Sequence, residues 1–196
     1  MLTHTRSIQD RVFDVWRSAG RFTKNPDIIE LPSGRVLLIY SDTDQHYSQK
    51  DQVLTLLASD DRGLTWFKHR EVARAEVAKG EERLITPRLS QLKDGRLVVL
   101  VDLAPGHFHE DLPSGNLAYW SEDDGDSWSD AQVTGILGFE PDRVIDLPDG
   151  RLAVASHLVS GDSQEYADIL SCSDDGGRSW YRQATIAHDG YHRFCE

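Results

Sequence analysis

The sequence has few of the residues that mark several large classes of protein. It has only 2 cysteines among 196 residues, too few for a disulfide framework. It also lacks an apolar run of about 18 residues, the length that a membrane-spanning helix needs, and its first residues, MLTHTRSIQDR, lack the apolar core of a signal peptide. We therefore expect a cytoplasmic protein, in which Cys172, at the end of the apolar run ADILSC, is a small buried hydrophobe.

An excess of positive charge is also missing. Lys and Arg number 21 against 33 Asp and Glu, which gives a net charge of −12 and a pI of about 5.0. Proteins that bind nucleic acids or anionic membranes need a basic patch. We therefore expect neither as a partner, and we interpret most of the acidic residues as a solvated surface.

What the sequence does contain is an octapeptide repeated three times. SDDRGLTW at 59–66, SEDDGDSW at 121–128 and SDDGGRSW at 173–180 all fit S-x-D-x-G-x-[ST]-W. The aspartate can accept hydrogen bonds from backbone N–H groups two or three residues on, the glycine can adopt a left-handed conformation, and the tryptophan can start a strand. We favour a structural turn over metal ligation or acid catalysis, because turns in separate repeats would lie far apart. The residues so assigned are Ser59, Asp61, Gly63, Trp66, Ser121, Asp123, Gly125, Trp128, Ser173, Asp175, Gly177 and Trp180.

A second pattern repeats in step with the octapeptides. NPDIIELPSGRVLLIY, TPRLSQLKDGRLVVLV and EPDRVIDLPDGRLAVA each contain a Leu, a short turn that ends in Gly-Arg, and an apolar run. Each unit therefore predicts strand, turn, strand, loop, strand, turn, strand. Because the octapeptide aspartates are 62 and 52 residues apart, each unit has room for about four strands. Units of this kind are typical of the blades of an all-β propeller.

These repeats resemble the Asp-box, or BNR repeat, of the sialidase (neuraminidase) superfamily. The resemblance implies a six-bladed β-propeller whose Asp-boxes lie at the periphery, away from the substrate. The chain looks like about the first half of such a ring, so we expect a fragment of a longer chain that exposes blade faces and self-associates. The expected parts are a ring-closing outer strand within 1–23, blades at 24–78, 83–135 and 138–188, and the start of a fourth blade at 189–196. For the N-terminal part, the short alternating run RVFDVW at 11–16 favours the strand, and a helix is the alternative.

Function is expected in the loops that follow the second strand of each unit. Carboxylates and imidazoles at corresponding positions of successive blades could converge on one pocket. The residues concerned are Asp42, Asp44, His46, His107, His109, Glu110, Asp111, His157 and Asp162. Two alternatives stay open: Asp42 and Asp44 can cap a turn, and His107 and His109 can share a face and bind a metal. We expect no metal and no cofactor.

The resemblance also implies site residues. The family holds the substrate carboxylate with three arginines, the first in an F-R-I-P-like motif, and here FTKNPDI places Lys24 where that arginine is expected. Arg88 and Arg143 open the next two blades, and Glu196 matches the glutamate that assists a tyrosine nucleophile. No tyrosine occupies a recognisable nucleophile position, and Tyr40, Tyr119 and Tyr166 are interpreted as packing residues.

Two hypotheses follow. The first is a sialidase-like glycoside hydrolase, inactive as the present chain alone, with Asp44, Glu110 and Glu196 as acid/base groups. In it, Lys24, His46, Arg88, His109 and Arg143 contact the carbohydrate. The alternative is a noncatalytic Asp-box propeller that binds a sugar or serves as an interaction scaffold.

Overall fold

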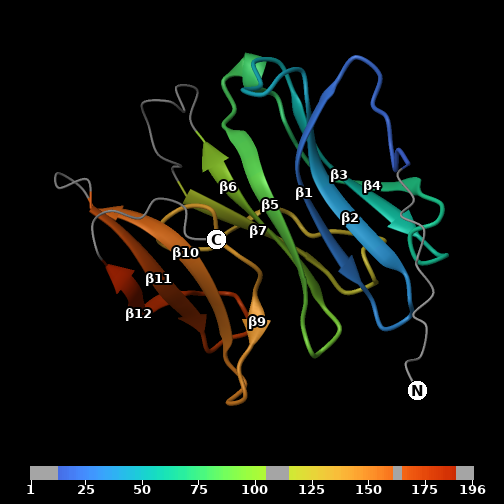
Figure 1. The fold of residues 1–196 in the computed structure, drawn as a ribbon. Helices are drawn as coiled ribbons and strands as arrows, with labels where there is room; N and C mark the ends of the chain where they lie inside the picture. Colours follow the sequence, from blue (N-terminus) through green and yellow to red (C-terminus); the bar gives the residue numbers. More distant parts are fainter. Residues whose placement is uncertain (1–12, 105–114, 161–164, 189–196) are drawn as a thin grey trace, which may run out of the picture.

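The computed structural model describes residues 13–104, 115–160 and 165–188. These residues form three antiparallel sheets of four strands, which follow one another across the molecule in chain order (Figure 1). The first sheet contains β1 (Phe22–Glu30), β2 (Val36–Thr43), β3 (Gln52–Ser59) and β4 (Phe67–Ala75); the second contains β5 (Arg83–Gln91), β6 (Leu97–Ala104), β7 (Gly115–Ser121) and β8 (Gln132–Val133); the third contains β9 (Ile145–Asp146), β10 (Leu152–Ser160), β11 (Glu165–Ser173) and β12 (Tyr181–His188). A short 3₁₀ helix, η1 (Val77–Lys79), joins the first two sheets. The expected all-β architecture of three four-stranded blades is confirmed.

The Gly-Arg repeats form the turn between the first two strands of each sheet. In the first sheet, Gly34 N–H donates to Leu31 O at 2.8 Å and Leu31 N–H donates to Arg35 O at 2.8 Å. Gly34 has a φ of 86°, a conformation that glycine adopts at little steric cost. The same bonds recur at Leu92 and Leu147, so one local sequence sets the register of three hairpins.

Each Asp-box closes a compact turn after the third strand. In the first box, Ser59 Oγ donates to Asp61 at 2.8 Å and accepts from Gly63 N–H at 2.8 Å, while Thr65 N–H donates to Asp61 at 2.8 Å. The Trp66 indole donates to Gly63 O at 3.0 Å. The boxes that begin at Ser121 and Ser173 repeat these bonds.

Two details of these turns differ from the expectation. The Asp61 carboxylate accepts from Leu64 N–H, three residues on as expected, but also from Thr65 N–H, four residues on, while the N–H of Gly63, two residues on, donates to Ser59 instead. The tryptophans also precede the strands instead of starting them, since β4 begins at Phe67 and β12 at Tyr181.

The core lies between neighbouring sheets. One apolar cluster joins the first two sheets, with Leu37, Ile39 and Leu56 packed against Leu97 and Val99, all fully buried. A second cluster joins the second and third sheets through residues such as Val98, Val154 and Trp180. Full burial of one such aliphatic side chain contributes about 1.5–3 kcal/mol, so the faces between sheets supply much of the stability. Cys172 is buried and unpaired, as expected, and Tyr40 and Tyr119 are buried within the strands.

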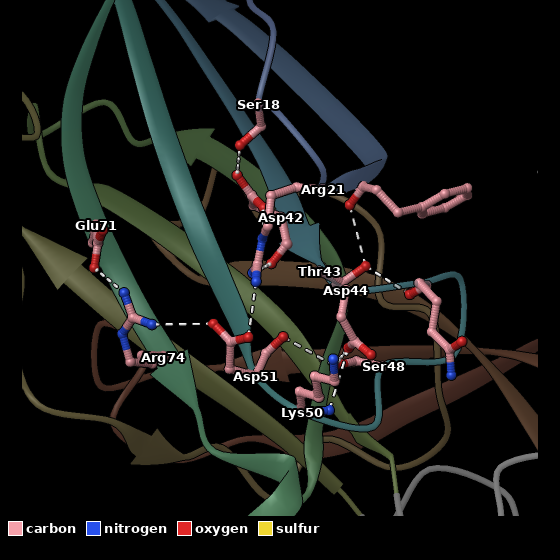
Figure 2. Close-up of polar contacts among 12 residues, drawn as sticks. Ser18, Arg21, Asp42, Thr43, Asp44, Ser48, Lys50, Asp51, Glu71 and Arg74 are labelled. Carbon is pink, nitrogen blue, oxygen red and sulfur yellow. Dashed lines mark hydrogen bonds and ion pairs between the residues drawn. The ribbon is translucent and has the colours of Figure 1, made fainter.

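The N-terminal segment is irregular where the structure describes it. Residues 13–21 form neither a strand nor a helix, and β1 begins at Phe22; residues 11 and 12 of the expected outer strand lie outside the described residues. Instead of β pairing, ion pairs attach this segment to the first sheet (Figure 2). Arg21 binds Asp42 at 2.5 Å and Asp51 at 2.8 Å, and Ser18 donates to Asp42 at 2.6 Å. None of the helical turns in the described ranges has the length and apolar character needed to cross a bilayer.

Candidate functional site

The site is built on an irregularity that recurs near the start of each unit, in β1, in β5 and in the segment that precedes β9. Asn25, Thr86 and Glu140 have φ angles of 51°, 50° and 48°, and each is followed by a proline. A left-handed conformation is uncommon for residues other than glycine, most of all for a β-branched one. The pairing register shifts at two of these points, between Lys24 and Asp27 and between Ile85 and Arg88. Bulges of this kind change the direction in which side chains leave a strand.

These three left-handed residues line one small pocket. Its volume is about 120 Å³, and its wall also contains Lys24, His46, Tyr47 and Arg83. Residues from the first two sheets and from the segment that precedes β9 therefore meet at one point. The Lys24 ammonium donates to His46 O at 2.6 Å, and burial, together with the positive charge of Arg83, lowers the pKa of Lys24. The His46 ring packs edge-on against Phe22 and Tyr47, with centroid distances of 5.6 and 4.5 Å.

A larger pocket of about 490 Å³ adjoins the small one, because Glu140 lines both. Its charged and polar lining residues come from all three sheets and are Asp27, Arg88, Glu140, Asp142, Arg143, Ser156, His157 and Asp168. The combined lining offers carboxylates, guanidinium groups and an imidazole. Such a mixture can both donate to and accept from the hydroxyl groups of a polar ligand.

Asp27 ties the three sheets together at the edge of this pocket. Its carboxylate accepts from Leu89 N–H of β5 at 2.8 Å and forms an ion pair with Arg143, which also donates to Ile28 O at 2.8 Å. The hydrogen bond to Asp27 raises the pKa of Arg143 above its ordinary value. Arg143 therefore serves in part to hold the third sheet on the first.

His157 and Asp168 form a pair across β10 and β11 within the larger pocket. His157 Nδ1 lies 2.8 Å from Asp168 Oδ1, and the two residues are register partners. The His157 ring also contacts Phe139, with a centroid distance of 5.8 Å. A carboxylate at Nδ1 fixes the orientation of an imidazole.

The structure brings five of the predicted residues to these pockets. Lys24 and His46 line the small one, and Arg88, Arg143 and His157 line the large one. The predicted residues His109, Glu110 and Glu196 lie outside the described residues, as do His107, Asp111 and Asp162. The Asp-box aspartates line neither pocket.

Asp44 lies in the loop between β2 and β3, where its carboxylate accepts three hydrogen bonds from that same loop. Ser48 Oγ donates at 2.7 Å, and Gln49 N–H and Lys50 N–H donate at 3.0 and 3.3 Å (Figure 2). Burial opposes ionisation, but these bonds outweigh it and lower the pKa of Asp44. A lowered pKa suits a turn cap better than a general acid.

Several lining residues were not predicted as site residues from the sequence, among them Asp27, Glu140, Asp142 and Asp168. For Asp27, Glu140 and Asp142, the sequence contained a pattern that could have identified them. The repeated segments NPD, TPR and EPD open the three units, and each begins with a left-handed residue that lines the small pocket. Asp168 had no such signal, because its role depends on pairing with His157.

Among the described residues, no three His, Cys, Asp or Glu side chains are grouped so that they could hold a metal ion.

Comparison with known families gives a clear match. The sequence pattern of the BNR repeat-like domain matches residues 59–193, which is most of the chain. The chain belongs to the BNR repeat-like domain family. The resemblance to Asp-box proteins is thereby confirmed. No curated protein matches the sequence.

Solved structures support the same fold. A protein of unknown function from Dyadobacter fermentans has a TM-score of 0.69 at 19% identity, over 89% of this chain and 57% of that one. An alpha-L-arabinanase of Penicillium chrysogenum complexed with arabinobiose has a TM-score of 0.59 at 16% identity, over 81% and 49%. The NanB sialidase of Streptococcus pneumoniae has a TM-score of 0.65 at 15% identity, over 90% and 46%.

This chain thus spans about half the length of the structures that it resembles. At these identities the likeness concerns the fold, because one fold can carry many activities.

Proposed function

We propose that the protein binds a carbohydrate in the two adjoining pockets and belongs to a glycoside-processing propeller. The observation that carries this proposal is the meeting of Asn25 of β1, Thr86 of β5 and Glu140, which precedes β9, in one pocket that Glu140 shares with a larger one. The likeness to an arabinanase and to a sialidase agrees with a sugar as the ligand class.

The chemistry of the lining fits this ligand class. Arg88 and Lys24 supply cationic donors, His46 adds an exposed ring beside them, and Glu140 supplies a half-buried carboxylate that both pockets share. Sugar hydroxyls both donate and accept, so they need donors and carboxylate acceptors at close quarters. Glycoside hydrolysis commonly requires a pair of carboxyl groups beside the scissile bond. In this proposal Glu140 is one of them, and Glu110 and Glu196 stay candidates for the other.

Noncatalytic sugar binding is the second candidate. Two observations favour it: the Asp44 carboxylate is engaged within its own loop, and Arg143 is paired with Asp27. In this case the two pockets bind the sugar without hydrolysing it.

Substitution of Arg88 tests the binding site. We expect Arg88→Ala to weaken binding of arabinobiose or N-acetylneuraminic acid about tenfold or more, because a hydrogen bond to a charged group contributes about 1.5–3 kcal/mol. Titration calorimetry with each sugar measures the affinity. The control is Arg17→Ala, since the Arg17 side chain is 82% exposed and lines neither pocket. Equal affinity of all three chains, or no binding of either sugar, would count against the proposal.

Hydrolysis distinguishes the two candidates. Release of the chromophore from aryl glycosides is measured with the protein and with Glu140→Gln. A hydrolase should lose about 100-fold or more of its turnover on this change, as expected for an acid/base group. Sugar binding without turnover selects the noncatalytic candidate.

A further inference from the structure

Asp102, on β6 beneath the pockets, is a fully buried carboxyl group. Its Oδ2 accepts from Thr86 Oγ1 at 2.7 Å and from Glu140 N–H at 2.8 Å. It therefore contacts two of the three left-handed residues that line the small pocket. Its other oxygen, Oδ1, is buried and has no hydrogen-bond partner in the described part of the chain.

Asn116, on β7, is the register partner of Asp102 and is also buried. Its amide Nδ2 donates to Gly138 O at 3.0 Å and to Ile136 O at 3.4 Å, which fixes the orientation of the amide. Asn116 Oδ1, like Asp102 Oδ1, is buried without a partner among the described residues. Two unsatisfied acceptors thus belong to directly opposed residues, whose Cβ atoms in a sheet are about 4.5–5.5 Å apart.

We propose that Asp102 is protonated in the folded protein and that its Oδ1–H donates a hydrogen bond to Asn116 Oδ1. A single proton then satisfies both orphan oxygens, each of which would otherwise carry the cost of a buried acceptor without a donor. It also removes the cost of a fully buried negative charge.

The electrostatic surroundings of Asp102 agree with its protonation. Burial is the main cause of the shift and raises the pKa of Asp102 to about 7, although the hydrogen bonds from Thr86 and the Glu140 backbone lower this pKa. The negative charge of Glu140, which precedes β9, raises this pKa further, and the positive charge of Arg88 on β5 lowers it. Asn116, from the other neighbouring strand, is uncharged.

The consequence is that the support of the chain beneath Glu140 depends on pH. Asp102 and Asn116 together bind Ile136, Gly138 and Glu140, which form the path of the chain into the shared wall of the pockets. Ionisation of Asp102 removes the bond to Asn116 and leaves a charge beneath this path. Asp102 is therefore a positioning residue for Glu140, and this inference does not depend on which ligand the pockets take.

The protonation is tested by carbon NMR of the wild-type chain labelled at the aspartate side-chain carboxyl carbon. We expect one resonance to titrate with a midpoint near pH 7, as the pKa of about 7 requires, and to disappear in Asp102→Asn. Asp42→Asn is the control, since Asp42 is also buried but is paired with Arg21; it should keep the resonance. A midpoint below pH 5 for Asp102 overturns the proposal.

The stability of Asp102→Asn gives a second measurement. The new amide can donate permanently to Asn116, as the protonated acid does. Because the pKa of Asp102 is raised in the folded state from 3.8 to about 7, the folded chain binds more protons than the unfolded chain between about pH 4 and 7. The wild type should therefore lose stability relative to Asp102→Asn as pH rises through this window. A constant difference between the two chains overturns the proposal.

Discussion

At the scale of single residues, the third Asp-box has the tightest steric limit of the three boxes. Gly177 has a φ of 94°, and a Cβ at this position would lie 2.5 Å from two ring carbons of Trp120. That ring is held in place, because its Nε1 donates to Gln132 at 3.2 Å and the Arg96 guanidinium lies 5.0 Å from its centroid. Glycine is needed at this position for two reasons: a side chain would collide with Trp120, and the backbone is left-handed.

This limit predicts that Gly177→Ala destabilises the chain by about 2–5 kcal/mol, the sum of a left-handed alanine and an overpacked contact. The matched control is Gly63→Ala in the first box, where the nearest atom to a Cβ, on Trp66, is 3.6 Å away and φ is 87°. There we expect only the backbone cost of about 1–2 kcal/mol. Urea unfolding measures both, and equal losses would show that the Trp120 contact contributes nothing.

At the scale of elements, the Asp-box turns depend on ionised aspartates. Hydrogen bonds from Thr65, followed by Ser59 and Leu64, lower the pKa of Asp61 from 3.8 to about 2, and Asp123 and Asp175 show the same shift. A folded-state pKa below the unfolded one stabilises the fold above about pH 4, and this stabilisation is lost as pH falls toward 2.

We therefore expect Asp61→Asn to lower the thermal unfolding midpoint at pH 7, by an amount that shrinks as the pH falls from about 4 to 2. Asp130→Asn, at an exposed position outside the boxes, should have no such pH-dependent effect. Thermal melts at intervals across this range measure the difference. A difference that stays the same at pH 2 would mean that the charge of Asp61 is not what stabilises the turn.

The elements were also the most predictable part of the structure. The Gly-Arg hairpins and the Asp-boxes are local, because Gly34 and Leu31, or Ser59 and Asp61, are bonded within a few residues of one another. The left-handed conformations of Asn25, Thr86 and Glu140 were not predicted, because a residue before proline is expected in extended conformation. Their left-handed geometry depends on the neighbouring sheets, as the bond from Glu140 N–H to Asp102 shows.

At the scale of the whole molecule, the pockets result from the way in which the sheets are placed side by side. Arg143 and Asp27 are 116 positions apart in the sequence and still form an ion pair. The sequence indicated that Lys24, His46, Arg88 and Arg143 occupy comparable places in their units. The division of these residues between two pockets follows from the rotation from one sheet to the next, which no local pattern encodes.

The two outer sheets also predict how the chain behaves in solution. In β1, Ile29 packs on the core while the adjacent Ile28 is 47% exposed, and Val144 is buried while Ile145 in β9 is 55% exposed. The first and third sheets thus present apolar side chains on their outer faces. We expect the chain to self-associate through these faces.

Sedimentation velocity over a range of concentrations tests this expectation. The double variant Ile28→Ser and Ile145→Ser should shift the chain toward monomer. Val133→Ser is the control, because Val133 is 73% exposed but belongs to the middle sheet. A wild-type chain that stays monomeric at all concentrations would contradict the expectation.

The recurring left-handed conformation also bears on how this scaffold can diversify. An amide, a hydroxyl and a carboxylate, at Asn25, Thr86 and Glu140, have nearly the same φ and line the same pocket. The proline after each of them keeps φ fixed at the next position whatever side chain precedes it. The Thr86 hydroxyl is bound to the buried Asp102, whereas the bond between Glu140 and Asp102 uses only the Glu140 backbone. Asn25 and Glu140 are therefore the positions at which selection, or an engineer, can change the ligand preference without rebuilding the blades.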